Sequence, residues 1–250
     1  MPRVIVLGDV HGCLSELEKL VCETNYKAGE DRLIVAGDLV DRGPASPDVI
    51  RYLMDIDANA VIGNHDHKLL RRWKHMDKMT LDSSYKNPMR PSLDQEHTIG
   101  QLGAKERDWL NGLPYSIQLE EYNTVISHAG LVPGIALERQ KPEAMMMVRY
   151  IHNDTGKMLT MEMPGYKQPA NSHYWAERWN GSYDVIFGHH VVGLEDIKIW
   201  DNGFGRAIGI DTGCVFGGML TALILDKSGN HQGVQVRAEK VYNNTLGSDE

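Results

Sequence analysis

The first 75 residues repeat one arrangement three times: a short apolar run, a glycine that ends it, and a stretch with helical spacing. The apolar runs cover residues 4–7, 33–36 and 60–62. Runs of this length that stop at glycine are typical of buried strands that enter a loop. Because strands that alternate with helices form parallel sheets, the chain predicts an α/β fold with its ligands at the carboxyl ends of the strands.

The helices expected between these strands cover residues 14–21, 46–56 and 68–74. Ser46 is expected to cap the second helix, with Pro47 in its first turn. Lys68, Arg71 and Arg72 share one face of the third helix, which fits a solvated surface better than a site that attracts a polyphosphate.

Two later segments depart from this pattern. Residues 75–114 are polar and predict a helical or irregular excursion outside the sheet. Residues 135–180 lack strand alternation and contain three prolines, so we expect a helical insert with loops. Strand-like runs with Gly-rich turns return from residue 183, which favours a mostly antiparallel second sheet. We expect one domain over residues 1–242 and a flexible polar tail over residues 243–250.

The composition excludes several classes of function. The net charge of −8 argues against non-specific binding to nucleic acid, but it leaves phosphorylated substrates open because bound metal ions supply positive charge locally. No apolar run is long enough to cross a membrane, and the N-terminus lacks the apolar region of a signal peptide. Cys13 and Cys214 are expected to be structural thiols, and the unpaired cysteines favour a cytoplasmic location.

Each predicted strand end carries residues that can bind a metal ion. The clusters read Gly8-Asp-Val-His-Gly12, Gly37-Asp-Leu-Val-Asp-Arg-Gly43, Gly63-Asn-His-Asp66, His128-Ala-Gly130 and Gly188-His-His190. Aspartate and histidine together offer hard oxygen and imidazole nitrogen, a set that suits Mn, Fe, Zn or Co better than Ca. Glycine lets the backbone turn sharply in these loops and approach an ion or a phosphate.

The motifs GDVHG, GDLVDRG, GNHD, HAG and GH, in this order, resemble the signature of the calcineurin-like metallophosphoesterases. The DRG extension narrows the resemblance to the phosphoprotein phosphatase superfamily. The closing stretch DTGCVFGG is most similar to bacterial bis(5'-nucleosyl)-tetraphosphatases and their phosphatase relatives. The resemblance spans roughly residues 3–225 and implies a four-layer α-β-β-α sandwich with two mixed sheets and a helical insert.

The resemblance also implies a pair of divalent metal ions, with manganese expected and Fe, Zn, Co or Mg as alternatives. Their ligands would be Asp9, His11, Asp38, Asn64, His128 and His189. Asp9 and His11 would hold the first ion, and Asp38 would bridge both. A shared carboxylate holds two dications about 3.5–4 Å apart, where together they acidify a water molecule that attacks phosphorus.

His65 would act as the general acid for the leaving oxygen, oriented by Asp41, whose carboxylate favours the charged imidazole. Arg42 would clamp the phosphoryl oxygens, since guanidinium geometry matches phosphate in a bidentate manner. A second clamping arginine is usual in the superfamily. Arg149 is the candidate for it, but a charge on the surface of a helix fits it equally well, because the methionines beside it also fit a core.

Other residues keep two interpretations. His190 would support the ligand His189 or contact substrate. The aromatic residues of the insert would either stack on a nucleobase or belong to the hydrophobic core. These residues are Tyr150, Tyr166, Tyr174, Trp175 and Trp179.

The chain therefore resembles a dinuclear-metal phosphohydrolase that cleaves phosphoanhydride or phosphomonoester bonds. The closing stretch favours a dinucleoside polyphosphate of the diadenosine tetraphosphate type as substrate. A serine/threonine protein phosphatase acting on a phosphoprotein is the alternative, because both groups share the DRG and NHD motifs. An RNA 5'-end hydrolase gains no support from the charge of −8. A metal-free binding module fits poorly with a complete ligand set.

Overall fold

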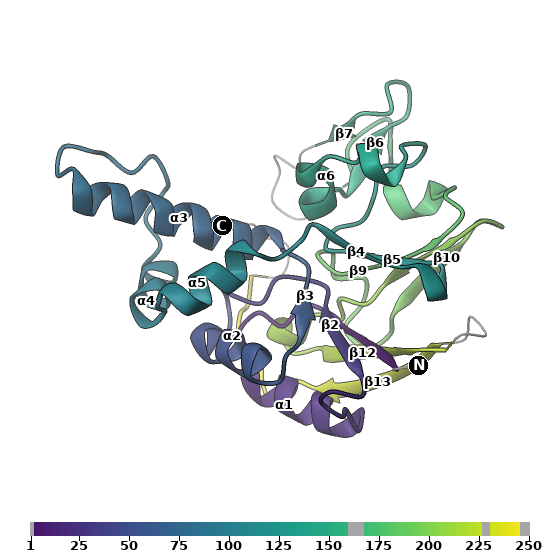
Figure 1. The fold of residues 1–250 in the computed structure, drawn as a ribbon. Coiled ribbons are helices and arrows are strands. Elements are labelled where there is room, and N and C mark those ends of the chain that lie inside the picture. Colours follow the sequence, from purple (N-terminus) through teal and green to yellow (C-terminus); the bar gives the residue numbers. More distant parts are fainter. Residues whose placement is uncertain (1–2, 160–167, 227–230, 246–250) are drawn as a thin grey trace.

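Two five-stranded sheets form the centre of the computed structural model, which describes residues 3–159, 168–226 and 231–245 (Figure 1). The first sheet contains β1 (Val4–Leu7), β2 (Arg32–Val35), β3 (Asn59–Ala60), β12 (Met219–Leu225) and β13 (His231–Arg237). The second contains β4 (Ser116–Leu119), β5 (Thr124–Ser127), β9 (Asp184–Phe187), β10 (Lys198–Asp201) and β11 (Arg206–Gly209). Each sheet has parallel and antiparallel pairs, which confirms the predicted α/β class with two mixed sheets.

The strands are covered on both faces because most of their residues are apolar. In β1, Ile5 and Leu7 pack toward the helices, whereas Val4 and Val6 face the second sheet. Successive side chains of a strand point to opposite faces, so one strand contributes to two cores. The helices over the first sheet are α1 (Leu14–Glu23) and α2 (Ser46–Asp55). The insert covers the outer face of the second sheet, which completes four layers (Figure 1).

The predicted excursion outside the sheet is confirmed as a helical arm. It contains α3 (Asn64–Leu81), α4 (Leu93–Gln101) and α5 (Ala104–Asn111), and it projects to one side of the sandwich (Figure 1). The first of these helices begins at Asn64 rather than at residue 68. The Asp66 carboxylate accepts a hydrogen bond from the Gly63 N–H at 2.9 Å and so caps this helix.

The predicted cap of α2 is wrong by one residue. Ala45 is the N-cap, and Ser46 is the first helical residue. The Ser46 hydroxyl instead accepts a hydrogen bond from the Asp41 N–H at 3.0 Å, so it holds the loop after β2. This loop carries the DRG motif.

The insert is less helical than expected. It contains α6 (Pro142–Met147) and a third sheet of order β7-β6-β8, built from β6 (Tyr150–His152), β7 (Met158–Leu159) and β8 (Ser172–Tyr174). Strands of two or three residues are too short to show alternation in sequence, which is why this sheet was missed. Tyr166 lies outside the described residues.

The prediction of a mostly antiparallel second sheet from residue 183 onward is also wrong. β9 and β11 pair in parallel, and β12 and β13 join the first sheet, where β12 runs antiparallel to β1. Apolar runs mark the strands but carry no information about which strand each one pairs with.

The N–H groups of Tyr242 and Asn243 donate to the Val215 carbonyl, and the last five residues of the expected tail (246–250) lie outside the described residues. No helix of the described chain is long and apolar enough to cross a membrane.

Candidate metal centre

The loops that follow five strands of the two central sheets meet at one site. Asp9 and His11 follow β1, Asp38 follows β2, and Asn64 opens the helix after β3. From the second sheet, the loops after β5 and β9 carry His128 and His189. The structure therefore brings together residues that lie up to 180 positions apart, as in the contact between the Asp9 carboxylate and the His189 N–H.

Asp38 lies between two groups of potential metal ligands. One group joins it to His11 and His65, the other to His128 and His189, and within each group the ligand atoms lie within 4.8 Å of one another. Asp38 Oδ2 is 3.5 Å from His11 Nε2, whereas Oδ1 is 3.3 Å from His128 Nε2. The two carboxylate oxygens thus face different histidines, which is the arrangement that a bridging ligand requires.

Backbone carbonyls orient two of these imidazoles. His11 Nδ1 lies 2.8 Å from the Val40 carbonyl, and His128 Nδ1 lies 2.8 Å from the Ala36 carbonyl. A donor N–H at Nδ1 leaves the lone pair on Nε2, the form in which imidazole binds metal. Asn64 Oδ1 lies 3.0 Å from His128 Nε2, so this asparagine points at the same place.

The loops hold several of these residues in strained backbone conformations. His11, Asp38 and His189 have φ values of 44°, 49° and 67°, a region that non-glycine residues rarely adopt. Such strain gathers at functional sites, where the surroundings impose it. Gly188 is required for a different reason: a Cβ atom there would lie 1.8 Å from Asp9 Oδ1.

The electrostatics of the centre fit divalent cations. Burial, followed by the charges of Asp211 and Asp38, raises the pKa of the Asp9 carboxyl well above its usual range. Burial lowers the pKa of His11 to about 3 and the pKa of His189 well below its usual value, so both imidazoles are neutral. Crowded carboxylates beside these two imidazoles offer oxygen and nitrogen lone pairs to a cation.

A single buried atom supports the same conclusion. His189 Nε2 is buried and has no hydrogen-bond partner within the described part of the chain. An unpaired buried nitrogen is costly, and a metal ion would satisfy it. The donor set is nitrogen and oxygen without sulfur, which fits the ions expected from the sequence.

His65 belongs to a chain of buried polar side chains. His65 Nδ1 lies 2.7 Å from Asp41 Oδ2, and the same oxygen accepts from Gln95 Nε2 at 2.7 Å. Gln95 Oε1 in turn accepts from Arg72 Nε at 2.7 Å. Burial acts to raise the pKa of Asp41, but the hydrogen bond and charge of His65 outweigh it and the pKa is lowered.

This chain corrects one expectation and adds a residue that was not expected. Arg72 is only 1% exposed, so its assignment to a solvated face is wrong, whereas Arg71 on the same helix is exposed. Gln95 lies in the arm, where no motif marks it. Asp211 was likewise not expected as a site residue. The feature of the sequence that could have identified it is the DTG triplet at residues 211–213, just after β11.

Both candidate arginines lie at the centre. Arg42 Nη1 is 3.0 Å from His11 Nε2, and its guanidinium sits over the Phe216 ring at 5.3 Å. Arg149 is buried, and its charge is the largest cause after burial of the lowered pKa of His189. Arg149 follows the end of α6, so it belongs to no helix of the core.

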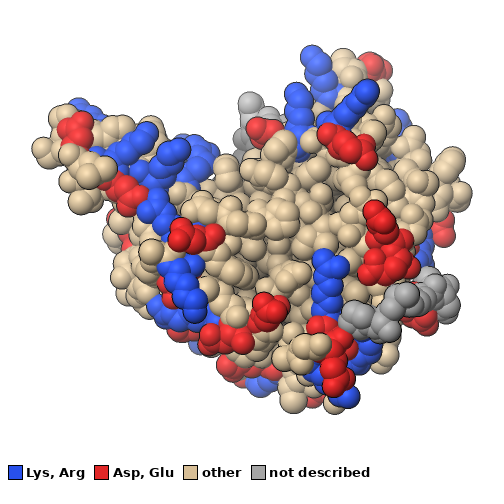
Figure 2. All heavy atoms as spheres, in the orientation of Figure 1, with Lys and Arg blue, Asp and Glu red and all other residues tan. Residues whose placement is uncertain are grey.

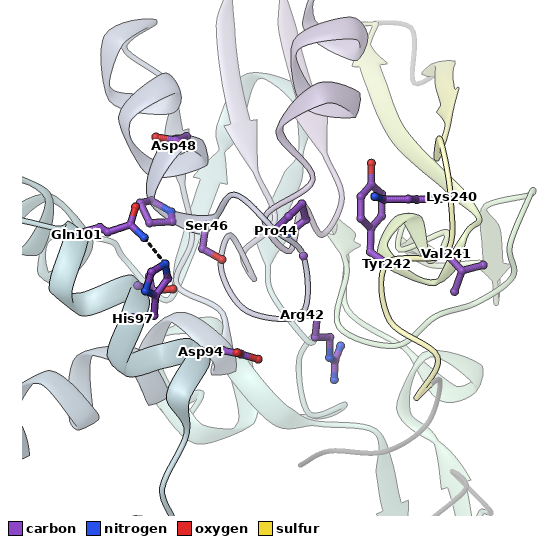
Figure 3. Close-up of a pocket in the computed structure, with 13 residues that line it drawn as sticks. Arg42, Pro44, Ser46, Asp48, Asp94, His97, Gln101, Lys240, Val241 and Tyr242 are labelled. Atoms are coloured by element: carbon purple, nitrogen blue, oxygen red, sulfur yellow. Dashed lines mark hydrogen bonds between the residues drawn. The ribbon is translucent and has the colours of Figure 1, made fainter.

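Two cavities are lined by residues that neighbour the centre, Arg42 in one and His190 in the other. The larger, of about 490 Å³, has Arg42 at its edge, α4 residues such as His97 on one side and residues 240–242 on the other (Figure 3). The smaller, of about 160 Å³, is lined by His190, Tyr174 and Trp200 among others. The Tyr174 ring lies 5.1 Å from the His190 ring and 5.3 Å from Trp200.

The structure separates the aromatic residues of the insert into two groups. Trp175 and Trp179 are core, since they are 0% and 2% exposed. Tyr150 and Tyr174 line the smaller cavity as well as packing against the core.

Comparisons with known proteins agree with this geometry. The sequence model of the family described as calcineurin-like phosphoesterase matches residues 2–211. An asymmetrical bis(5'-nucleosyl)-tetraphosphatase from Oceanobacillus iheyensis is 29% identical over 235 residues, which cover 88% of this chain and 87% of the relative. A symmetrical bis(5'-nucleosyl)-tetraphosphatase from Serratia proteamaculans is 28% identical and covers 87% of this chain and 89% of its own length.

Solved structures are similar as well. A protein assigned provisionally as a diadenosine tetraphosphatase has a TM-score of 0.70 and 32% identity, with coverage of 94% of this chain and 96% of that one. A protein serine/threonine phosphatase from Saccharomyces cerevisiae has a TM-score of 0.56 at 12% identity, over 96% of this chain and 80% of that one. The second likeness concerns the fold alone.

Proposed function

This chain belongs to the calcineurin-like phosphoesterase family, and we propose that it hydrolyses dinucleoside polyphosphates of the diadenosine tetraphosphate type. The observation that carries the proposal is the Asp38 carboxylate, whose two oxygens face two separate histidine groups. The substrate class rests on relatives of both cleavage types, each similar over most of its length.

We propose that the six predicted residues hold two divalent ions, manganese foremost. Their side chains are Asp9, His11, Asp38, Asn64, His128 and His189. When bound, the ions supply Lewis-acid activation of water and neutralise charge on the phosphoryl group.

The other residues act on the substrate directly. In its imidazolium form His65 donates the Nδ1–H to Asp41 and carries a second proton at Nε2, which it donates to the leaving oxygen. Arg42 and Arg149 bind and orient the phosphoryl oxygens. The burial of His65 at 7% exposure excludes most water from this transfer.

The two cavities favour a substrate with a nucleoside at each end. Arg42 lines one cavity, and His190, the neighbour of His189, lines the other. A phosphate chain that crosses the metal centre would place its two nucleosides in these cavities. The aromatic lining formed by Tyr174 and Trp200 suits a base.

A basic stripe on α3 supports attraction of a polyphosphate. Arg71, Lys74 and Lys78 are exposed at helical spacing, on the helix that begins at the proposed ligand Asn64. Figure 2 shows Lys and Arg side chains along this arm. The molecule as a whole is acidic, so this stripe is a local exception.

A panel of substrates tests the proposal. Protein loaded with manganese is given diadenosine tetraphosphate, ATP, a phosphothreonine peptide and an aryl phosphate, and kcat/KM is compared. We expect the dinucleotide to be preferred by at least about tenfold, the scale of about 1.4 kcal/mol in transition-state binding. Two ADP molecules would indicate symmetrical cleavage, and AMP with ATP asymmetrical cleavage. Preference for the phosphopeptide would establish the protein phosphatase alternative instead. A cytoplasmic location stays a prediction.

A further inference from the structure

A second cluster of metal-binding side chains lies outside the dinuclear centre. Cys13, Glu16 and Cys214 place their sulfur and carboxylate atoms within 4.8 Å of one another. They come from two distant parts of the chain: Cys13 is the N-cap of α1, Glu16 is in its first turn, and Cys214 starts a short 3-10 helix after β11. All three are buried, at 1%, 0% and 2% exposure.

Glu16 lacks the partner that a buried carboxylate needs. Its Oε1 accepts from the Glu239 N–H at 2.9 Å and from the Tyr242 hydroxyl at 2.8 Å. Its Oε2 is buried without a hydrogen bond, and no Lys, Arg or His of the described residues forms an ion pair with Glu16. A buried carboxylate without a cation is costly, so the unpaired oxygen points to a missing positive charge.

The neighbours of this carboxylate are two thiols, whose sulfur atoms lie within 4.8 Å of each other and of a carboxylate oxygen. A disulfide between them would be neutral and would leave Glu16 Oε2 unpaired. A soft dication would instead use both sulfurs and satisfy the carboxylate. Thiolate ligands select zinc and similar ions.

We propose that Cys13, Glu16 and Cys214 form a structural site for one zinc ion, separate from the dinuclear centre. Ligand atoms around a tetrahedral zinc ion lie about 3.5–3.8 Å apart, given bonds of about 2.0–2.3 Å, so small side-chain rotations within the 4.8 Å cluster suffice. The fourth position takes a water molecule. Through Glu16 the ion would also fasten residues 239–242 to α1.

Cobalt is the probe, because thiolate-bound Co(II) has a charge-transfer absorption in the near ultraviolet that imidazole and carboxylate ligands do not produce. Protein reduced with a phosphine and freed of metal is titrated with Co(II). We expect this absorption to saturate by three equivalents per chain, because the dinuclear centre also takes up Co(II), and to be lost on addition of excess zinc.

Four variants locate the site. Cys214→Ser and Glu16→Gln should abolish the charge-transfer absorption or lower the affinity for Co(II) by at least tenfold. Cys22→Ser, which changes the exposed cysteine, should leave both unchanged. Asp38→Asn disrupts the proposed dinuclear centre but should retain the absorption, so the two sites fail independently. The proposal would be overturned if the wild-type protein, with both thiols reduced, showed no such absorption. It would also be overturned if Cys22→Ser alone lost the absorption. The wild-type spectrum is decisive even if a core variant does not fold.

Discussion

At the scale of single residues, the position of His65 depends on one motif residue and on two residues that the family motifs do not include. Its imidazole is held by Asp41, Asp41 by Gln95, and Gln95 by Arg72. Every link is a side-chain hydrogen bond of 2.7 Å. In a buried network, removal of one member leaves its neighbours without partners, so distant members affect the orientation of the last.

His65→Asn tests the role of the imidazole itself. We expect kcat to fall by about 10²–10⁴, the usual range for the loss of a general acid, while bound metal stays unchanged. Metal analysis and steady-state kinetics on the same preparation check this. Because His65 also lies in one ligand group with His11 and Asp38, a parallel loss of metal would make it a ligand instead.

Gln95→Met tests the support behind His65. The substitution keeps the volume but removes both hydrogen bonds, so we expect kcat to fall by about tenfold and KM to stay within about twofold. Gln118→Met, at an exposed position of β4, is the matched control and should have no effect. Equal kcat in the two variants would show that Gln95 does not support His65.

At the scale of secondary-structure elements, one ion pair ties three strands from both sheets. The Asp184 carboxylate at the start of β9 accepts from the Arg206 N–H at 2.7 Å and from Arg206 Nε at 3.0 Å. His231 Nε2, at the start of β13, lies 3.9 Å away. Burial acts to raise the pKa of Asp184, but hydrogen bonds from His231 and Arg206 outweigh it and hold the pKa below its usual range.

Asp184→Asn should therefore destabilise the protein in a pH-dependent manner. A depressed pKa stabilises the folded state above the unfolded pKa of about 3.9, and this contribution is lost as pH falls through the folded value. We expect the free energy of unfolding to drop by about 1–2 kcal/mol at pH 7, with a smaller difference near pH 2. Urea unfolding at several pH values measures it. Asp196→Asn, at an exposed position, is the control, and a pH-independent difference would contradict the assignment.

Elements also mark the limit of prediction from sequence. The strands over residues 4–7 and 220–225 were visible as apolar runs, but their antiparallel pairing was not, because it depends on contacts between distant segments. The metal-binding motifs were visible because each lies next to a glycine at a strand end. Gln95 and Glu16 were not, since a lone polar residue on a helix acquires meaning only from what folds against it.

At the scale of the whole molecule, the charge of −8 is unevenly distributed. The exposed cations of α3 extend outward from the candidate metal centre. The start of α3 also lies near the insert, as shown by the effect of the Glu143 charge on the pKa of His67. Charge of one sign beside a site raises the local concentration of an oppositely charged substrate.

The double variant Arg71→Ala and Lys74→Ala tests this stripe. We expect KM for diadenosine tetraphosphate to rise about three- to tenfold at low salt while kcat stays within about twofold, because the stripe attracts substrate without touching the reacting atoms. The difference should fade at about 0.5 M salt, where exposed charges are screened within a few ångströms. Lys27→Ala, at an exposed position in the loop after α1, is the control, and a KM shift that persists at high salt would indicate direct contact.

If Asp38 bridges two metal ions, its replacement should release both, so the metal content of Asp38→Asn distinguishes a bridge from two independent sites. Wild-type and variant proteins are equilibrated with Mn(II) and analysed for bound metal, with His65→Asn as the control that keeps its ions. Because both histidine groups depend on Asp38, we predict that both manganese ions are lost together, with kcat reduced by at least about 10³. Retention of both ions in Asp38→Asn would contradict the account.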